Sequence, residues 1–126
     1  MTLRSNLHNP KTPRRDRVAE QLREEISSLM LREMKDPRVR LASISRVRVS
    51  PDLREAWLMV SAVGEEAQRQ AVLEAMRHAA GYLRAQLGAR LENLRSVPQL
   101  HFELDESIAY SVRINTMLRE LEPHRT

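Results

Sequence analysis

The alternation of residues 55–63 restricts the fold more than any other pattern in the chain. Its small and aliphatic side chains share one parity: Ala56, Leu58, Val60 and Ala62. Because successive side chains of a strand point to opposite faces of a sheet, this parity predicts a strand with one buried face. Trp57 and Met59 have the other parity. Two environments stay open for them: an exposed sheet surface, where the tryptophan could stack a base, or the underside of a late helix or loop.

Helices must cover the buried face of such a sheet, and the first is predicted from about Thr12 to Met34. Thr12 is a suitable N-cap, and Pro13 suits the first turn. Apolar residues then recur at helical spacing: Val18, Leu22, Ile26, Leu29 and Met30. Pro37 ends this helix, because the residue before a proline avoids the helical region.

Residues 39–49 predict a further strand, joined to residues 55–63 by a turn that contains Pro51. Ile44 breaks the parity of the valines on either side of it. A β-bulge, or a strand that starts late near Ser43, is therefore expected.

Residues 65–91 have helical spacing interrupted near Gly81, and residues 97–104 alternate again. Ser107 is expected to cap a final helix through Leu121. The order α-β-β-α-α-β with an additional C-terminal helix predicts an α+β domain, one sheet covered by helices, of the kind seen in prokaryotic KH modules. Three parts are expected: a flexible basic arm over 1–12, the domain over 13–121 and a short tail over 122–126.

Basic residues gather in two stretches, although the net charge of the whole chain is only +4. Residues 1–17 hold five basic residues and one acidic residue, and residues 38–54 hold the same. The end, 103–122, holds five acidic and two basic residues. Phosphate backbones are common polyanions, and the planar fork of arginine suits both phosphates and base stacking. The charge pattern therefore predicts RNA binding.

Composition argues against several other classes of protein. Without cysteine there are no disulfides, thiolate metal sites or cysteine nucleophiles. No apolar run reaches the roughly 18 residues of a membrane span, and the N-terminus lacks the apolar core of a signal peptide, so we expect a cytoplasmic protein. The histidines do not form a metal-ligand pattern, and the chain has no Walker loop or nucleophile elbow. We expect neither enzymatic activity nor a cofactor.

KH domains bind single-stranded nucleic acid with a GxxG loop between two helices, and that loop is absent here. Ala79-Ala80-Gly81 stands at the corresponding place. Small residues there would allow a kinked helix with close approach of another backbone, or would merely let two helices pack tightly. Both interpretations stay open.

Three blocks of sequence together resemble the ribosome-binding factor A family over residues 13–118. They are Asp36-Pro37-Arg38-Val39, Ala79-Ala80-Gly81 and the stretch LRSVPQLHFELD from Leu94 to Asp105. The third block is long and is the most specific. Arg40 departs from the family, which often has glycine there, and the chain stops soon after the predicted last helix, where many relatives carry a longer polar tail.

The resemblance implies a type II KH-like fold with a helix–kink–helix. It also implies binding to the free or immature small (30S) ribosomal subunit and support of its late maturation, including processing of the 5′ end of 16S rRNA. The expected partner is that subunit, with ribosomal proteins and a maturation GTPase as further candidates. We expect a monomer that does not bind membranes. The alternative is a protein-interaction module that docks on a ribosomal protein or a ribosome-associated GTPase through its acidic end.

Ten residues are predicted RNA contacts: Arg14, Arg15, Arg17, Arg38, Arg46, Arg48, Arg77, His78, Arg84 and Arg95. Five more belong to the family motif and the kink: Ala79, Ala80, Gly81, Pro98 and Asp105. Arg46 and Arg48 have the parity opposite to that of the neighbouring valines, so their side chains should leave the sheet together. Structural roles stay open for two of these residues, because Arg95 could simply pair with a carboxylate and Asp105 could cap the last helix.

Overall fold

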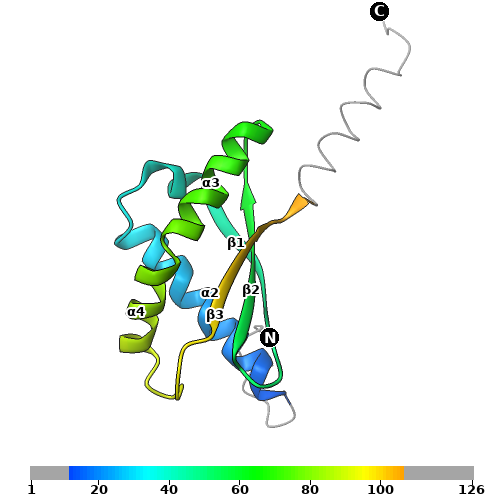
Figure 1. Cartoon of the computed structure of the whole chain (residues 1–126), viewed down its shortest axis with the longest axis vertical. Helices are drawn as coiled ribbons and strands as arrows, with labels where there is room; N and C mark the ends of the chain where they lie inside the picture. The colour runs from blue at the N-terminus through cyan, green and yellow to red at the C-terminus, as the bar shows by residue number, and fades with distance from the viewer. Residues whose placement is uncertain (1–11, 107–126) are drawn as a thin grey trace, which may run out of the picture.

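The computed structural model describes residues 12–106 and places helices on one face of a three-stranded sheet (Figure 1). In chain order the elements are α2 (Arg14–Arg32), the 3-10 helix η1 (Pro37–Leu41), β1 (Ala42–Val49), β2 (Glu55–Ala62), α3 (Glu66–His78), α4 (Ala80–Arg90) and β3 (Gln99–Leu104). The predicted α+β class is confirmed. The predicted arm apart from Thr12, the last helix and the short tail lie outside the described residues.

The sheet has the strand order β1-β2-β3, with β2 in the middle. β1 and β2 form the predicted antiparallel hairpin, whereas β2 and β3 are parallel. A parallel pair cannot be joined by a tight turn, so the chain has to cross from one end of the sheet to the other. Helices α3 and α4 make that crossing and cover the sheet on the way (Figure 1).

The start of β1 differs from the prediction, because the segment from Pro37 forms η1 instead of extended chain. The carboxylate of Asp36 caps this short helix by accepting a hydrogen bond from the backbone N–H of Arg38 (3.0 Å). The register with β2 then shifts between Ile44 and Arg46, which leaves Ser45 as the extra residue of a β-bulge. Both expected explanations of the parity break at Ile44 therefore hold: the strand starts late, and it contains a bulge.

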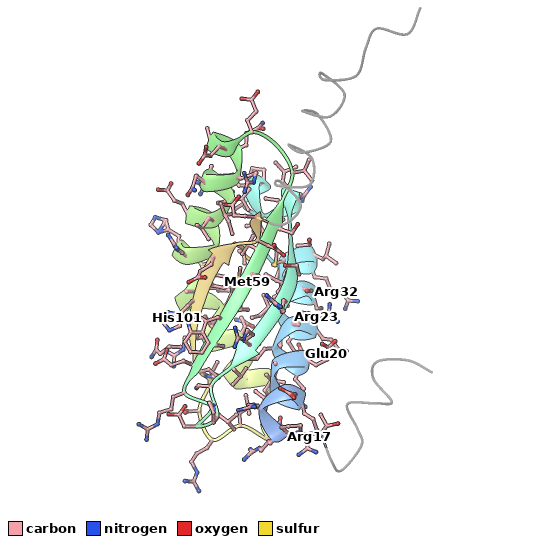
Figure 2. All side chains as sticks on the ribbon, turned by 90° about the vertical axis from the view of Figure 1, so that its right-hand side faces the viewer. Arg17, Glu20, Arg23, Arg32, Met59 and His101 are labelled. Carbon is pink, nitrogen blue, oxygen red and sulfur yellow. The ribbon has the colours of Figure 1, made fainter. Side chains whose placement is uncertain are left out.

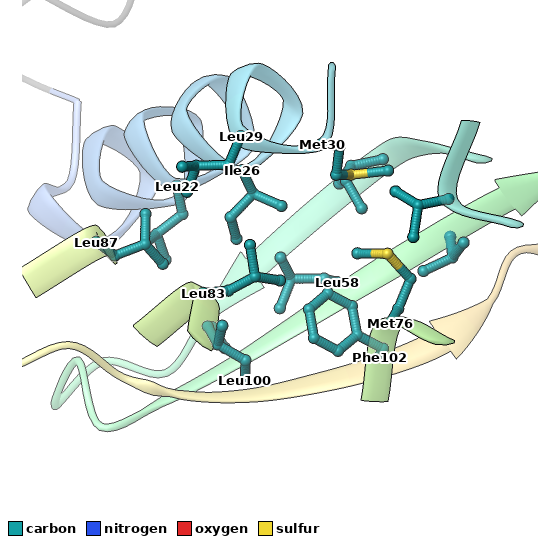
Figure 3. Close-up of a cluster of buried hydrophobic side chains, with 14 of the residues drawn as sticks. Leu22, Ile26, Leu29, Met30, Leu58, Met76, Leu83, Leu87, Leu100 and Phe102 are labelled. Atoms are coloured by element: carbon teal, nitrogen blue, oxygen red, sulfur yellow. The ribbon is translucent and has the colours of Figure 1, made fainter. Parts of the chain in front are cut away.

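The core lies between the helices and the inner face of the sheet (Figure 3). The predicted apolar faces of α2 and β2 are buried, as are Leu83 and Leu87 of α4 and Phe102 of β3. Phe102 is the one phenylalanine of the chain, and leucine, isoleucine, valine, alanine and methionine make up the rest of the buried hydrophobic cluster. Burial of this apolar area is the dominant favourable term in folding.

The long predicted helix is broken at Ala79, which separates α3 from α4. The backbone N–H of Ala79 still donates to the carbonyls of Ala75 and Met76, both at 3.1 Å, so the chain turns without losing its hydrogen bonds. Gly81 lies within α4 without a positive φ, and a Cβ built on it meets nothing within 4 Å. Gly81 is therefore neither the break point nor a place of tight packing within the described residues. Of the two interpretations left open for the block Ala79-Ala80-Gly81, the break of the helix is found, at Ala79, whereas tight packing at Gly81 is not.

Candidate nucleic-acid interface

One end of the molecule brings together three segments that are far apart in the sequence: the start of α2, the β1–β2 hairpin and the α4–β3 loop (Figure 1). The guanidinium of Arg14 donates from Nη2 to the carbonyl oxygen of Asn93 (3.3 Å), which ties α2 to that loop. The side-chain amide of Asn93 donates to Gln21 Oε1 (3.2 Å). This end is hereafter called the basic end, because each of its three segments contributes arginines.

The antiparallel run of α2 and β1 explains why two basic stretches of the sequence meet at the basic end. α2 packs against β1, and the hairpin after β1 returns to where α2 begins. Arg15 consequently lines one shallow hollow together with Arg46 and Arg48. Arg46 and Arg48 are exposed, as their parity predicted, and neither has a partner among the described residues.

Arg17 of α2 and Arg95 of the α4–β3 loop also belong to the segments of the basic end, and neither is paired within residues 12–106. A carboxylate partner for Arg95, one of the two open interpretations, is therefore not found in the part of the chain that the structure describes. Arg54, at the tip of the hairpin, is a further exposed arginine that was not among the predicted contacts. Its position could have been inferred from the predicted turn, since a turn residue next to a basic strand shares that end of the strand.

The basic end has fewer carboxylates than arginines, and the carboxylate of Asp52 already accepts two hydrogen bonds. Asp52 accepts hydrogen bonds from the Ser50 hydroxyl (2.6 Å) and from the backbone N–H of Arg54 (3.1 Å). These donors lower the pKa of Asp52, first through the Ser50 hydroxyl and then through the N–H of Arg54. Asp16 lies 4.0 Å from Arg15, and Glu103 lines the far side of the shared hollow.

Arg77 and Arg84, on either side of the helix break, have different surroundings from the arginines of the basic end. Arg77 donates from Nε to the carbonyl of Phe102 (3.2 Å). Arg84 donates from Nε to the carbonyl of Pro98 (3.1 Å) and from Nη2 to that of Val97 (2.9 Å). Both therefore hold the outer edge of β3, which has no strand partner beyond it in the described sheet. Their role as RNA contacts stays a prediction.

Arg38 and His78 form a third location, near the end of α3. Arg38 donates from Nη2 to Asp36 (2.8 Å), and this hydrogen-bonded pair lowers the pKa of Asp36. His78 is exposed and close enough to add a smaller electrostatic effect on the same carboxyl. The ten predicted contacts thus fall into three groups. Only the group at the basic end joins arginines from different elements, and four of its members, Arg17, Arg46, Arg48 and Arg95, have no partner within residues 12–106.

The motif residues Pro98 and Asp105 flank β3 and anchor it. Pro98 is buried, and its carbonyl is the one that Arg84 contacts. Asp105 donates its backbone N–H to the carbonyl of Val60 (2.7 Å) and accepts a hydrogen bond from the hydroxyl of Ser45 (2.7 Å), the bulged residue of β1. Its predicted role as a cap of the last helix falls on residues outside the described range. Ala79 and Ala80 are partly buried, and Ala80 lies with Arg77 in a shallow hollow beside β3.

The open face of the sheet holds an aromatic pair that sequence patterns did not predict. The rings of Trp57 and His101 stack with centroids 5.8 Å apart and an angle of 25° between their planes. Parity placed each ring on an outer face, but their contact depends on the register of β2 with β3, in which they are direct partners. Figure 2 looks onto this face, with Met59 and His101 toward the viewer.

The described residues give no support for a metal site or a membrane span. Within residues 12–106, no group of three histidine, cysteine, aspartate or glutamate side chains is arranged to hold a metal ion. In the same range no helix has the length and hydropathy needed to cross a membrane. Fold and surface together define a small α+β protein that presents arginines at one end, several of them unpaired in the part of the chain that the structure describes.

Comparison with known proteins agrees with this class. The profile of the family described as ribosome-binding factor A matches residues 14–118. Ribosome-binding factor A of Thermomicrobium roseum is 40% identical over 112 residues, which cover 89% of this chain and 86% of the relative. The chain therefore belongs to the ribosome-binding factor A family.

Two structures of Thermus thermophilus ribosome-binding factor A are similar to this fold. The crystal structure matches with a TM-score of 0.64 and 27% identity, covering 74% of this chain and 97% of that one. A homology model fitted into a cryo-electron microscopy map of its complex with the 30S subunit matches with a TM-score of 0.58 and 28% identity, covering 70% of this chain and 91% of that one.

Proposed function

We propose that this chain binds RNA of the free or immature small ribosomal subunit and assists the late maturation of that subunit, including processing of the 5′ end of 16S rRNA. The basic end carries the proposal. Arg15, Arg46 and Arg48 line one hollow, and Arg17 and Arg95, from α2 and the α4–β3 loop, are unpaired in the described part of the chain. The relative from Thermus thermophilus, described in a complex with the 30S subunit, supports the choice of partner.

The same proposal includes a KH-like fold of type II. The order of α2, β1, β2, α3, α4 and β3 and the break between α3 and α4 support it. The break holds Ala79 in place of a GxxG loop, so the phosphate contacts of this chain have to come from other residues. The arginines of the basic end supply the phosphate contacts instead.

Co-sedimentation with purified small subunits, mature and immature, tests the proposal directly. The double variant Arg46→Glu, Arg48→Glu should lose most of its binding and keep its melting temperature, because both side chains are exposed and unpaired among the described residues. Reversing charge beside phosphates turns attraction into repulsion.

A matched control is Arg32→Glu, Lys35→Glu, which makes the same change in net charge at the other end of α2 (Figure 2). Arg32 is 15 positions from Arg17, roughly 22 Å along a helix. The control should bind nearly as well as the unchanged protein. Equal binding by both double variants would rule out the basic end as the RNA contact. Binding that does not respond to salt would favour docking on a ribosomal protein or GTPase.

A cellular measurement addresses maturation separately from binding. A strain that lacks this chain should accumulate small-subunit rRNA with an unprocessed 5′ end. The control variant should restore processing, whereas Arg46→Glu, Arg48→Glu should not. Normal processing in the strain that lacks the chain would contradict the maturation part of the proposal.

A further inference from the structure

The face of the sheet that α2, α3 and α4 leave open in the described range carries the one tryptophan of the chain. Trp57 lies on the middle strand with 37% of its surface exposed, and its register partners are Arg48 on β1 and His101 on β3. Met59, next on the same face, has Arg46 and Glu103 as its partners (Figure 2). Each of these two rows runs from a cation on β1 to an apolar side chain on β2.

His101 fixes the position of the indole ring without covering all of it. Its imidazole stacks on one face of Trp57, and its Nε2 contacts the carboxylate of Glu55. An aromatic ring held in this way loses little further freedom when a ligand stacks on it, which favours binding. His101 approaches from β3, so the other face of the indole is turned toward β1 and Arg48.

Charge is distributed unevenly across the same face. On the β1 side, Arg46 and Arg48 have no partner among the described residues. Arg15 of α2 lines the hollow with them, and so does Asp16, which lies 4.0 Å from Arg15. On the β3 side stands the carboxylate of Glu103. A phosphate chain would be attracted to the first side and repelled from the second, so a strand of RNA would place its backbone over β1 and its bases toward Trp57.

We infer that this open face binds single-stranded RNA by stacking one base on Trp57 while Arg46 and Arg48 contact the phosphates beside it. The inference rests on the proposed RNA-binding function and adds a site for a base to it. Stacking on an exposed aromatic ring beside a basic groove is the common mode of single-strand binding. The face that the helices cover could not serve, because its side chains form the core.

Glu103 adds a preference among bases. It lines the hollow that Trp57 and Met59 also line, on the β3 side toward which the bases would point. A carboxylate accepts a hydrogen bond from the amino group of cytosine, whereas uracil presents a carbonyl oxygen at the same position. The site should therefore prefer cytosine over uracil in otherwise identical strands.

Tryptophan fluorescence gives a direct test, because Trp57 is the only source of that signal in the chain. In the free full-length protein, acrylamide should readily quench the fluorescence of Trp57, since the indole ring is partly exposed. Titration with cytidine oligonucleotides of roughly eight residues should quench the fluorescence and protect it from acrylamide. Uridine oligonucleotides of the same length should do so only at higher concentration. A ring inaccessible to acrylamide in the free chain would overturn the inference, because the face would already be covered.

Variants separate stacking from general attraction. Trp57→Leu should weaken binding of labelled cytidine oligonucleotides by roughly 5- to 150-fold, and Trp57→Phe should retain most of it. Glu103→Gln should reduce the difference in affinity between cytidine and uridine strands. A melting curve for each variant shows whether it is folded. If Trp57→Leu fails to fold, the fluorescence quenching by oligonucleotides and the protection from acrylamide, both measured on the unchanged protein, still decide whether a base stacks on Trp57.

The outcome also distinguishes this inference from the proposed function. If small subunits bind normally to Trp57→Leu and oligonucleotides leave the fluorescence unchanged, base stacking is wrong while RNA binding by the basic end stands. If Arg46→Glu, Arg48→Glu binds small subunits as well as the unchanged protein does, the proposed function fails at this surface. Stacking would then lose the phosphate contacts on which it depends.

Discussion

Arg84 and Arg48 are both arginines of the predicted RNA face, but their surroundings differ. Arg84 is partly buried and donates to the carbonyls of Val97 and Pro98, just before β3. Arg48 is exposed and has no partner within the described range. Removal of a charged donor from buried carbonyls leaves those carbonyls without a hydrogen bond. Removal of an exposed, unpaired arginine leaves no group unsatisfied.

Arg84→Met should therefore destabilise the fold by about 1–3 kcal/mol, because methionine keeps much of the apolar stem and loses the hydrogen bonds. Arg48→Met, the matched control, should leave the free energy of unfolding nearly unchanged and weaken RNA binding. Urea denaturation of the two variants measures the difference. Equal stabilities would mean that the contacts of Arg84 with the chain before β3 contribute nothing measurable.

This distinction between arginines could not be predicted from the sequence. Parity correctly placed Arg46 and Arg48 outside the sheet, because strand geometry alone determines which face a side chain leaves from. The partners of Arg77 and Arg84 are backbone carbonyls of β3 and the residues just before it, about 13 to 25 positions away in the chain. Only the packing of α3 and α4 against that strand brings them within reach.

At the scale of elements, the junction from β2 to α3 depends on Gly64. Its φ of +129° lies in a region that other residues rarely adopt, and a Cβ built there comes within 2.4 Å of Gln68 Oε1. That oxygen accepts a hydrogen bond from the backbone N–H of Glu65 (2.9 Å), as part of the capping box that starts α3. A side chain at Gly64 would strain the backbone and disturb the cap together.

Gly64→Ala should lower the free energy of unfolding by roughly 1–3 kcal/mol. Gly81→Ala is the control, since Gly81 lies in α4 with open space around it and alanine is the better helix former. It should raise stability by up to about 1 kcal/mol. Thermal melts of both variants provide the comparison. A lower midpoint for Gly81→Ala would show that this glycine has a structural role after all.

Helix and strand periodicity predicted most elements. Where the boundaries of an element differ from the simple period, the cause is local. The parity break at Ile44 located the bulge, because an extra residue in one strand must shift every side chain after it. β1 starts at Ala42, close to the late start that was one of the two expected explanations, because Asp36 and Pro37 first form a 3-10 turn. The helix break lies at Ala79, inside the block Ala79-Ala80-Gly81 where a kink was one of the two open interpretations, but not at Gly81, the poorest helix former of that run.

At the scale of the whole molecule, the basic end combines positive charges from α2, β1 and the α4–β3 loop. Its affinity for RNA should therefore depend on the salt concentration. Six of the predicted contacts belong to it: Arg14, Arg15, Arg17, Arg46, Arg48 and Arg95. Each single-strand phosphate neutralised contributes a slope of about 0.7 in log affinity against log salt. If all six contact phosphates, the affinity for RNA should fall with a slope of roughly 4, and fewer contacts give a proportionally smaller value.

Removal of residues 1–11 tests how far this surface extends along the chain. The segment carries two basic residues, Arg4 and Lys11, and no acidic residue. The buried residues of the described core begin at Val18. The truncated chain should therefore melt at the same temperature, bind small subunits more weakly at low salt and show a salt slope smaller by up to about 1.4, two phosphates at about 0.7 each. Affinity measured at several salt concentrations gives both slopes. Identical slopes and affinities for the two chains would confine the RNA contact to residues 12–126, because a cation that neutralises a phosphate cannot be removed without changing the slope.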